Sequence, residues 1–293
     1  MGLQDYCFDG KRELDLKELP TGAWDEGLTK KDKERCIAAT EKNLAHIAAL
    51  QDKLYAAGKE GVVVVLQAMD AAGKDSTIKH VMRGVNPQGV DVVSFKQPSS
   101  EELRHDYLWR AHRALPERGK IAIFNRSYYE DVLVVRVHRM QKDYAMASRC
   151  LDMPDKEFFE KRYAQIRHFE EYLYENSYRV VKIFLNVSRQ KQKQRFLERI
   201  DIPEKNWKFS QSDLKERAHW DEYMHAYEKA VNETATGHSP WYVVPADQKW
   251  YARYLISQVV RQVLEEADPE YPELPKERQR DLAECKKLLE TER

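Results

Sequence analysis

The chain has 293 residues, 42% of them hydrophobic and 33% charged, and its 49 basic residues balance its 49 acidic residues. This length suffices for one α/β domain with additions or for two small domains, and a core of this size needs no cofactor to support it. The zero net charge excludes a uniformly basic surface, so a groove that binds a polyanion must be local and offset by acidic surface elsewhere.

The cysteines and the N-terminal segment indicate a cellular location. Four cysteines lie far apart and show neither C-x-x-C nor Cys/His spacing, which favours free thiols in a reducing compartment. The first residues are charged and lack an apolar stretch, so a secretory signal is not expected. No uncharged stretch approaches the roughly 20 residues that cross a bilayer. We therefore expect a cytoplasmic protein with no membrane partner.

The first 58 residues are predicted to form an extension that packs on the core. They comprise a polar arm, punctuated by Pro and Gly, and a helix over residues 29–57. The core is expected over residues 59–270, and a helical tail over residues 271–293. Apolar side chains recur on one face of the first helix, namely Ile37, Leu44, Ile47, Leu50 and Leu54.

The core alternates short apolar runs with amphipathic stretches. Its first run, GVVVVL at residues 61–66, is nearly unbroken and is typical of a parallel strand buried on both faces. This alternation predicts an α/β fold with a five-stranded parallel sheet flanked by helices, in which ligands bind beyond the carboxyl ends of the strands. The expected strands cover residues 61–66, 91–95, 121–124, 179–187 and 241–244, and the expected helices include residues 78–82, 103–111, 154–176, 188–200, 213–234 and 249–267.

The turn after the first strand has the form of a phosphate-binding loop, with the sequence QAMDAAGKDST at residues 67–77. In such a loop backbone N–H groups point inward, the following helix presents its positive end, and Lys74 adds a mobile positive charge. The alternative is an ordinary strand-to-helix turn with a solvated lysine. The residues expected to bind phosphate here are Ala71, Ala72, Gly73, Lys74, Asp75 and Ser76.

The loop departs from the strict pattern G-x-x-x-x-G-K-[ST] at both ends. Ala68 stands in place of the first Gly, and Asp75 in place of the hydroxyl that binds Mg²⁺. The expected metal ligand is therefore Asp70, the nearest hard oxygen donor in the loop. The alternative is that Asp70 caps the helix that follows.

A second candidate element is FNRSYYED at residues 124–131, at the end of the third expected strand. The strand would deliver Arg126 near the loop, where its guanidinium could bridge donor and acceptor phosphates. Asn125 would supply a neutral carbonyl or amide, and Glu130 would begin the next helix. The alternative is that Arg126 is a salt-bridge partner and Glu130 a simple helix charge. The candidate catalytic residues are thus Asp70, Lys74, Asn125, Arg126 and Glu130.

A third candidate element is a basic stretch that begins in the helix expected over residues 188–200. Its place between the fourth strand and a loop that contains Pro203 favours a lid over residues 188–212, like the lid of nucleoside monophosphate kinases. The alternative is a solvated helix face. Tryptophans could stack on a base, although they more often serve packing, and the candidates are Trp207, Trp220, Trp241 and Trp250. The lid residues expected to bind phosphate are Arg189, Lys193, Arg195, Arg199 and Lys208.

The loop and the second element together resemble the motifs of the polyphosphate kinase 2 family. The likeness covers most of the chain and includes VNPQG at residues 85–89, EKNWKF at residues 204–209 and PWYVVPAD at residues 240–247. The resemblance implies a thymidylate-kinase-like P-loop kinase fold with a helical lid. It implies transfer of the terminal phosphate of inorganic polyphosphate to a nucleotide, with Mg²⁺ as cofactor and Mn²⁺ as an alternative.

The resemblance also implies roles for single residues and for partners. Asp70 and Lys74 match the family's loop, Asn125 and Arg126 its second motif, and residues 189–199 its lid. Glu130 after Ser-Tyr-Tyr is similar to members that accept both AMP and ADP, so we expect reversible conversion of AMP to ADP and ATP. A homodimer or homotetramer is expected, and a nucleic acid partner is not. The alternatives are an ATP-dependent nucleoside or nucleotide kinase and a non-catalytic regulator that binds polyphosphate or nucleotide.

Overall fold

The computed structural model, which describes residues 2–292, contains a mixed α/β fold with a six-stranded sheet. The strand order is β1-β6-β5-β2-β4-β3, and β2 to β6 pair in parallel. β2 therefore lies inside the sheet, between β5 and β4. The strands are β1 (Cys7–Phe8), β2 (Gly61–Gln67), β3 (Val90–Ser94), β4 (Ile121–Asn125), β5 (Tyr178–Asn186) and β6 (Trp241–Pro245).

The prediction of five strands was wrong by one edge strand, β1. Each of the five predicted strands is present, but β1 pairs antiparallel to β6, with Cys7 opposite Tyr242 and Phe8 opposite Trp241. Two residues are too few to show the alternation that marks a strand, and they lie inside a polar arm. The N-terminal arm thus covers an edge of the sheet that would otherwise expose unpaired backbone groups.

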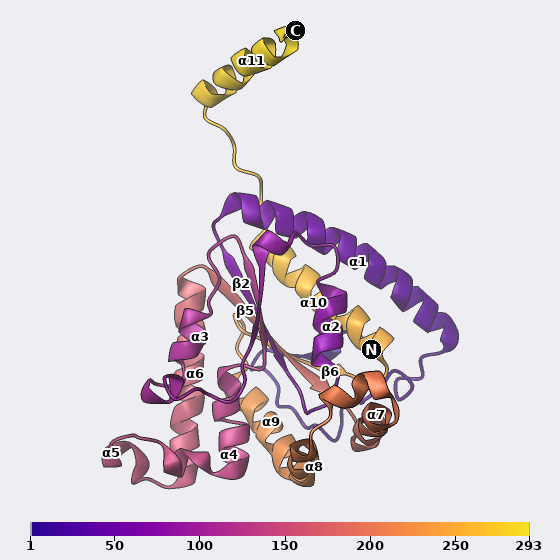
Figure 1. Ribbon diagram of the computed structural model, residues 1–293, viewed down its shortest axis with the longest axis vertical. Coiled ribbons are helices and arrows are strands. Elements are labelled where there is room, and N and C mark those ends of the chain that lie inside the picture. Colours follow the sequence, from indigo (N-terminus) through magenta and orange to yellow (C-terminus); the bar gives the residue numbers. More distant parts are fainter. Residues whose placement is uncertain (1, 293) are drawn as a thin grey trace.

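Helices cover both faces of the sheet, as Figure 1 shows. On one face α10 packs against the strands, and α1 and α2 pack against α10. The other face carries α3, α4, α6 and α9, while α7 and α8 lie at the carboxyl ends of the strands. The helices are α1 (Lys30–Ala57), α2 (Lys74–Val81), α3 (Trp109–Arg113), α4 (Val134–His138), α5 (Ser148–Leu151), α6 (Asp155–Glu175), α7 (Arg189–Asp201), α8 (Gln211–Ala218), α9 (Trp220–Thr234), α10 (Lys249–Ala267) and α11 (Lys276–Thr291).

The ends of α1 follow from local signals in the sequence. Thr29 and Asp32 form a capping box, in which the Thr29 amide donates to the Asp32 carboxylate at 3.0 Å and the Thr29 hydroxyl accepts from the Asp32 amide. The helix ends at Gly58, whose φ of 61° is the left-handed conformation that glycine adopts without strain. Between these signals Leu44 and Ile47 are buried, so α1 packs through the predicted face.

Two helices predicted from the sequence are interrupted in the structure, one by a side-chain turn and one by tertiary contacts. The helix predicted over residues 103–111 is a 3₁₀ turn, Glu102–Arg104, followed by the short α3. The Asp106 carboxylate accepts from the Leu108 amide at 2.9 Å, which is a turn that interrupts a helix. The helix predicted over residues 213–234 divides at His219 into α8 and α9. No Gly or Pro marks that break, so contacts with α4 and α7 impose it.

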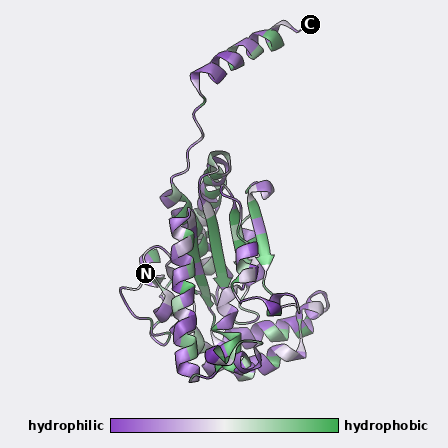
Figure 2. Cartoon of the chain, turned by 90° about the vertical axis from the view of Figure 1, so that its left-hand side faces the viewer, coloured by the Kyte–Doolittle hydropathy of each residue, from purple (hydrophilic) through white to green (hydrophobic). Residues whose placement is uncertain are grey.

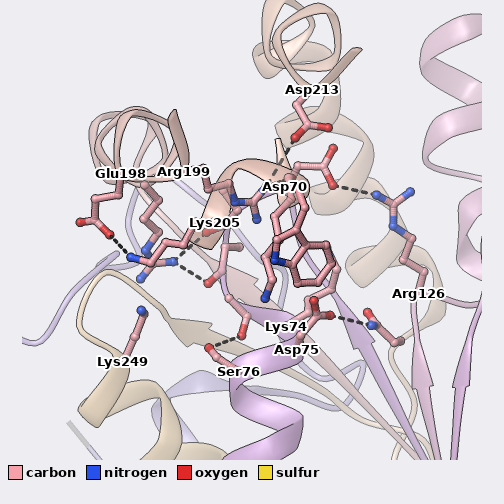
Figure 3. Close-up of a pocket in the computed structure, with 17 residues that line it drawn as sticks. Asp70, Lys74, Asp75, Ser76, Arg126, Glu198, Arg199, Lys205, Asp213 and Lys249 are labelled. Carbon is pink, nitrogen blue, oxygen red and sulfur yellow. Dashed lines mark hydrogen bonds and ion pairs between the residues drawn. The ribbon is translucent and has the colours of Figure 1, made fainter. Parts of the chain in front are cut away.

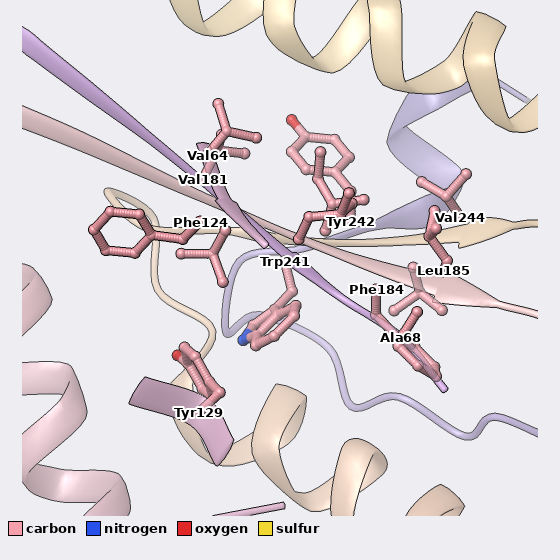
Figure 4. Packing of buried hydrophobic residues seen from close by; sticks show 14 of the residues in the cluster. Val64, Ala68, Phe124, Tyr129, Val181, Phe184, Leu185, Trp241, Tyr242 and Val244 are labelled. Carbon is pink, nitrogen blue, oxygen red and sulfur yellow. The ribbon is translucent and has the colours of Figure 1, made fainter. Parts of the chain in front are cut away.

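The core lies on both faces of the sheet. All seven residues of β2 are buried, as expected for a central parallel strand. Figure 2 shows strands coloured as hydrophobic and helices whose outer faces are hydrophilic. Successive residues of β6 point to opposite faces, so Trp241 lies beside Tyr129 on one face while Tyr242 lies on the other (Figure 4). Both side chains of this β6 pair are almost fully buried.

The C-terminal segment leaves the body of the protein after α10. Residues 268–275 lead to α11, which lies apart from the other helices in Figure 1 and is exposed along its whole length. The four cysteines are free thiols, as predicted. No helix within residues 2–292 has the length and apolar character needed to cross a membrane.

Candidate functional site

The predicted phosphate-binding turn joins β2 to α2 at the carboxyl edge of the sheet. We call residues 68–75 the phosphate loop. Gly73 precedes α2 with a φ of 106°, and Ala71 has a φ of 58°, a left-handed conformation that is rare for a residue with a side chain. The first helical bond of α2 runs from the Thr77 amide to the Gly73 carbonyl at 3.0 Å. The amides before it have no helical acceptor, which suits an anion.

A cleft of about 450 Å³ opens beside the phosphate loop (Figure 3). Seven Lys and Arg side chains line it, against four Asp and Glu side chains, so the neutral protein contains a locally positive cleft as predicted. Its lining combines the loop and five other segments. The lining residues are Asp70, Ala71, Ala72, Gly73, Lys74, Asp75, Ser76, Asn125, Arg126, Arg195, Glu198, Arg199, Lys205, Trp207, Lys208, Asp213 and Lys249.

Lys74 is the first residue of α2, and its side chain folds back onto the phosphate loop. Its ammonium donates to the carbonyls of Ala68 at 2.7 Å and Met69 at 3.4 Å. The pKa of Lys74 is lowered to about 8, mainly by burial and also by the nearby Arg126, against the raising effect of Asp70. A desolvated cation next to a second cation is poorly stabilised by the protein alone, so an anion would improve its surroundings.

Arg126 lies at the carboxyl end of β4 and faces the loop, as predicted. A left-handed backbone conformation, with φ of 62°, turns the chain at this residue. Its guanidinium pairs with the Asp70 carboxylate at 2.7 Å and lies 3.6 Å from the Glu130 carboxylate. Burial raises the pKa of Glu130, and the nearby cations Arg126 and Lys74 oppose that rise. Arg126 is therefore both a salt-bridge partner and a residue of the cleft, whereas Glu130 is not among the residues that line it.

Asn125 links the two predicted motifs. Its side-chain amide donates to the Asp75 carboxylate at 2.9 Å, which ties the end of β4 to the start of α2. Because parallel β4 and β2 end side by side, the two motifs meet at one edge of the sheet.

The acidic residues of the cleft fit a hard cation that also binds substrate. Burial raises the pKa of Asp213, and the Asp70 carboxylate raises it further, so the two carboxylates interact. Among the residues that the structure describes, no group of three or more His, Cys, Asp or Glu side chains could hold a metal ion. Mg²⁺ commonly binds through one or two protein carboxylates, completed by waters and phosphates. The chemistry of Asp70 and Asp213 suits such an open site.

The predicted lid residues separate by helix face. Arg195 and Arg199 are four residues apart on α7 and line the cleft, and Lys208 joins them from the 3₁₀ turn Pro203–Lys208. Arg189 and Lys193 are exposed and lie outside the cleft, because the helical repeat places them on another face of α7. The structure therefore brings three of the five predicted lid residues to the loop.

Five residues of the cleft were not among the predicted site residues. Lys205 and Trp207 lie in the EKNWKF segment, where the basic pattern was visible in the sequence. Lys249 begins α10 just after β6, so the rule that ligands bind beyond strand ends could have found it. Asp213 and Glu198 sit in helices with ordinary surface patterns, and no signal in the sequence distinguished them.

A strand–loop–helix turn and a cation-lined cleft at the carboxyl edge of a mainly parallel sheet are features of α/β proteins that bind phosphate. The chain belongs to the polyphosphate kinase 2 family, since the family model described as Polyphosphate kinase 2 (PPK2) matches residues 29–272. This confirms the family predicted from the sequence.

Similar proteins extend over nearly the whole chain. The ADP-polyphosphate phosphotransferase of Rhodopseudomonas palustris is 48% identical over 279 residues, which are 94% of each chain. The AMP/ADP-polyphosphate phosphotransferase of Meiothermus ruber is 47% identical over 266 residues, covering 90% of this chain and 93% of the relative. The crystal structure of polyphosphate kinase 2 from Arthrobacter aurescens TC1 superposes with a TM-score of 0.82 at 37% identity, covering 97% of this chain and 96% of that one.

Proposed function

We propose that the protein transfers the terminal phosphate of inorganic polyphosphate to AMP and to ADP, giving ADP and ATP. The observation that carries the proposal is the cleft itself, in which the phosphate loop and Lys74 face the lid cations Arg199 and Lys208 across a space of about 450 Å³. Polyphosphate is a chain of anions, so it needs cations on more than one side. The names of two relatives at 47% and 48% identity support both acceptors.

The proposed reaction exchanges one phosphoanhydride bond for another. An oxygen of the acceptor's terminal phosphate forms a bond to the terminal phosphorus of polyphosphate. The bond from that phosphorus to its bridging oxygen breaks, and the bridging oxygen leaves with the electron pair on a chain one phosphate shorter. Bonds of the same kind are made and broken, so concentrations set the direction. The protein's task is therefore to position the phosphates and to stabilise their charge.

The residues of the cleft divide this task. The loop amides and Lys74 would bind the transferred phosphoryl group, and Arg126 would bridge it to the acceptor phosphate. Arg199 and Lys208 would bind the polyphosphate chain from the lid. We propose Mg²⁺, with Mn²⁺ as an alternative, held by Asp70 and Asp213. When bound, the metal neutralises charge on the phosphate oxygens.

This division of labour also supports a P-loop kinase fold with a mobile lid over residues 188–212, built on the observed sheet. Arg199 of α7 and Lys205 of the 3₁₀ turn Pro203–Lys208 line the cleft together with the loop (Figure 3). The homodimeric or homotetrameric assembly and the cytoplasmic location stay predictions.

One incubation tests the proposed function against its alternatives. Purified protein is mixed with AMP, Mg²⁺ and long-chain polyphosphate, with no ATP added, and nucleotides are measured over time. We expect ADP to appear first and ATP to follow. Phosphorylation of AMP only after ATP is supplied would identify a conventional kinase. Bound polyphosphate without any product would identify a regulator.

The affinity for polyphosphate should depend on the protonation of Lys74. Only the protonated ammonium attracts phosphate, and its pKa in the free protein is about 8. Affinity is therefore expected to be highest below that pH and to fall as the pH rises through it. Calorimetric titrations from about pH 6.5 to about pH 9.5 measure the profile. Lys74→Arg should abolish the inflection because arginine stays charged, whereas Lys249→Arg should retain it. An inflection that persists in Lys74→Arg would contradict the assignment.

Trp207 offers an aromatic face at the mouth of the cleft. Its side chain is 79% exposed, and the Lys208 ammonium lies 4.9 Å from the ring centroid. A ring so exposed contributes little to packing, but it can stack on a nucleotide base. Trp207→Ala is expected to raise the KM for AMP about tenfold and to change the KM for polyphosphate less than about twofold.

Initial-rate measurements with either substrate varied check this prediction. Trp207→Phe should keep most of the affinity, since it keeps a face for stacking. Tyr172→Ala removes an aromatic ring that is 50% exposed on α6, away from the cleft, and serves as a control. If Trp207→Ala impaired polyphosphate instead of AMP, the stacking role would be refuted.

A further inference from the structure

Arg195 lines the cleft, yet its guanidinium is directed at the backbone. The residue is 6% exposed. One terminal nitrogen donates to the carbonyls of Ala71 at 3.2 Å and Ala72 at 2.6 Å. The other donates to the carbonyls of Ala246 at 2.7 Å and Asp247 at 3.2 Å. Its remaining nitrogen, Nε, is buried and has no hydrogen-bond partner within residues 2–292. The guanidinium thus joins the phosphate loop to the segment after β6.

A second residue of α7 binds the same loop. Gln192 is 1% exposed and donates from Nε2 to the Asp70 carbonyl at 2.9 Å. Its side-chain oxygen accepts from Arg217 of α8 at 2.5 Å, which fixes the orientation of the amide. Gln192 and Arg195 are three residues apart and lie on one face of the helix. Together they bind the carbonyls of three consecutive loop residues, 70 to 72.

These bonds bear on the loop's capacity to bind anions. A peptide unit has its carbonyl and its amide on opposite sides, so a carbonyl held toward α7 turns the next amide away from α7. Ala71 is left-handed, with φ of 58°, a conformation that persists only where the surroundings hold it. Arg195 does not offer its terminal nitrogens to a phosphate in this arrangement, because they donate to backbone carbonyls. Arg199, one turn further along α7, also lines the cleft, and its side chain is 23% exposed. Its Nη1 donates to the Lys208 carbonyl at 3.1 Å and lies 3.4 Å from the Asp213 carboxylate.

We propose that Arg195 and Gln192 are positioning residues, which hold the phosphate loop in its anion-binding conformation through α7 and do not bind phosphate themselves. This changes the role expected for Arg195 from its sequence, and it makes the base of the lid a support for the loop. The test by turnover rests on the proposed function. The tests by loop exchange and by polyanion binding are independent of it.

The matched pair Arg195→Gln and Arg199→Gln tests the proposal, because each variant removes one cation from the same helix. Polyphosphate affinity is measured over a series of salt concentrations. Removing a cation that contacts phosphate should lower the log–log salt slope by about 0.7 to 0.9, and this is expected for Arg199→Gln. Arg195→Gln is expected to weaken binding with an unchanged slope. An equal fall in slope for both variants would make Arg195 a phosphate ligand and overturn the proposal.

Turnover supplies a second readout through a variant that keeps the charge. Arg195→Lys should lower kcat by about 10²-fold, because a lysine cannot span four carbonyls and a misplaced loop slows transfer. The KM for polyphosphate should change less than about threefold. A wild-type kcat in Arg195→Lys would show that charge alone suffices, and it would refute a positioning role.

Hydrogen exchange in the ligand-free protein separates the proposal from the proposed function. Peptides that cover residues 68–77 should exchange faster in Arg195→Gln than in Arg199→Gln, whether or not polyphosphate is a substrate. Equal exchange would overturn the proposal. Should Arg195 variants fail to fold, Gln192→Met keeps the side-chain volume and loses the bonds to the Asp70 carbonyl and to Arg217. It is expected to show faster loop exchange and about tenfold lower kcat, and wild-type values for both would be a refutation.

Discussion

Replacing Lys74 by alanine is expected to lower kcat about 10³-fold, because it removes a preorganised cation from the phosphate that is transferred. The effect should appear in kcat as well as in kcat/KM, since charge develops on this group during transfer. Steady-state assays with saturating AMP and polyphosphate measure it. A matched control is Lys79→Ala, which removes an exposed lysine from the same helix, α2. The control is expected to retain normal turnover.

The fold should survive this substitution. The pKa of Lys74 is lowered to about 8, mainly by burial, so the charged ammonium is less stable in the folded protein than in water. Removing it deletes bonds to the Ala68 and Met69 carbonyls but also relieves a desolvated charge. We expect a thermal midpoint equal to or above that of the wild type, as is common when a functional charge is removed. A kcat within about threefold of wild type in Lys74→Ala would remove the proposed site.

Patterns local in the sequence were enough to predict the sheet and the loop. The apolar runs of β2 and β4 are long enough to be recognised, and the Gly73-Lys74 pair follows the first of them directly. Parallel pairing of these strands then requires that Asn125 and the loop meet, so the core of the site follows from strand order. The predicted ends of α1 and α7 were close to those observed, because Thr29 and Ser188 cap these helices and Gly58 ends the first of them.

Features that depend on contacts distant in the sequence were not predictable in this way. β1 has two residues and exists because β6 offers an edge. The direction of Arg195 depends on carbonyls from residues 71 and 246, which the fold brings together, so a basic pattern alone suggested a phosphate ligand. The break at His219 likewise follows from contacts of α8 with α4 and α7. In each case tertiary structure overrides a local pattern.

The environment of Lys182 also could not be predicted from the sequence. In the sequence it is a single lysine within the apolar strand β5, a pattern that suggests an exposed side chain. It is in fact fully buried and pairs with the equally buried Glu170 of α6 at 2.5 Å. It also donates to the Thr234 carbonyl at 2.8 Å. Burial lowers the pKa of Lys182, and Glu170 opposes that fall. The other oxygen of Glu170 accepts from the hydroxyls of Tyr128 at 2.8 Å and Tyr129 at 2.9 Å.

This network supports the second motif of the site. Tyr128 and Tyr129 follow Arg126 by two and three residues, so their bonds to Glu170 anchor the turn that carries the guanidinium. A buried pair of charges contributes little net stability compared with apolar residues, but losing one partner leaves the other charged and unpaired. Removing one partner of the Lys182–Glu170 pair is therefore expected to lower the stability more than replacing both partners.

Lys182→Met is accordingly expected to lower the free energy of unfolding by about 3 to 5 kcal/mol, because the Glu170 carboxylate stays buried without its cation. Urea denaturation measures this change. The double variant Lys182→Met/Glu170→Gln should recover more than half of the loss, since a neutral amide has no charge to desolvate. Lys161→Met breaks an exposed pair with Glu157 and should cost less than about 1 kcal/mol. If the double variant were as unstable as Lys182→Met, lost packing rather than an orphaned charge would explain the effect.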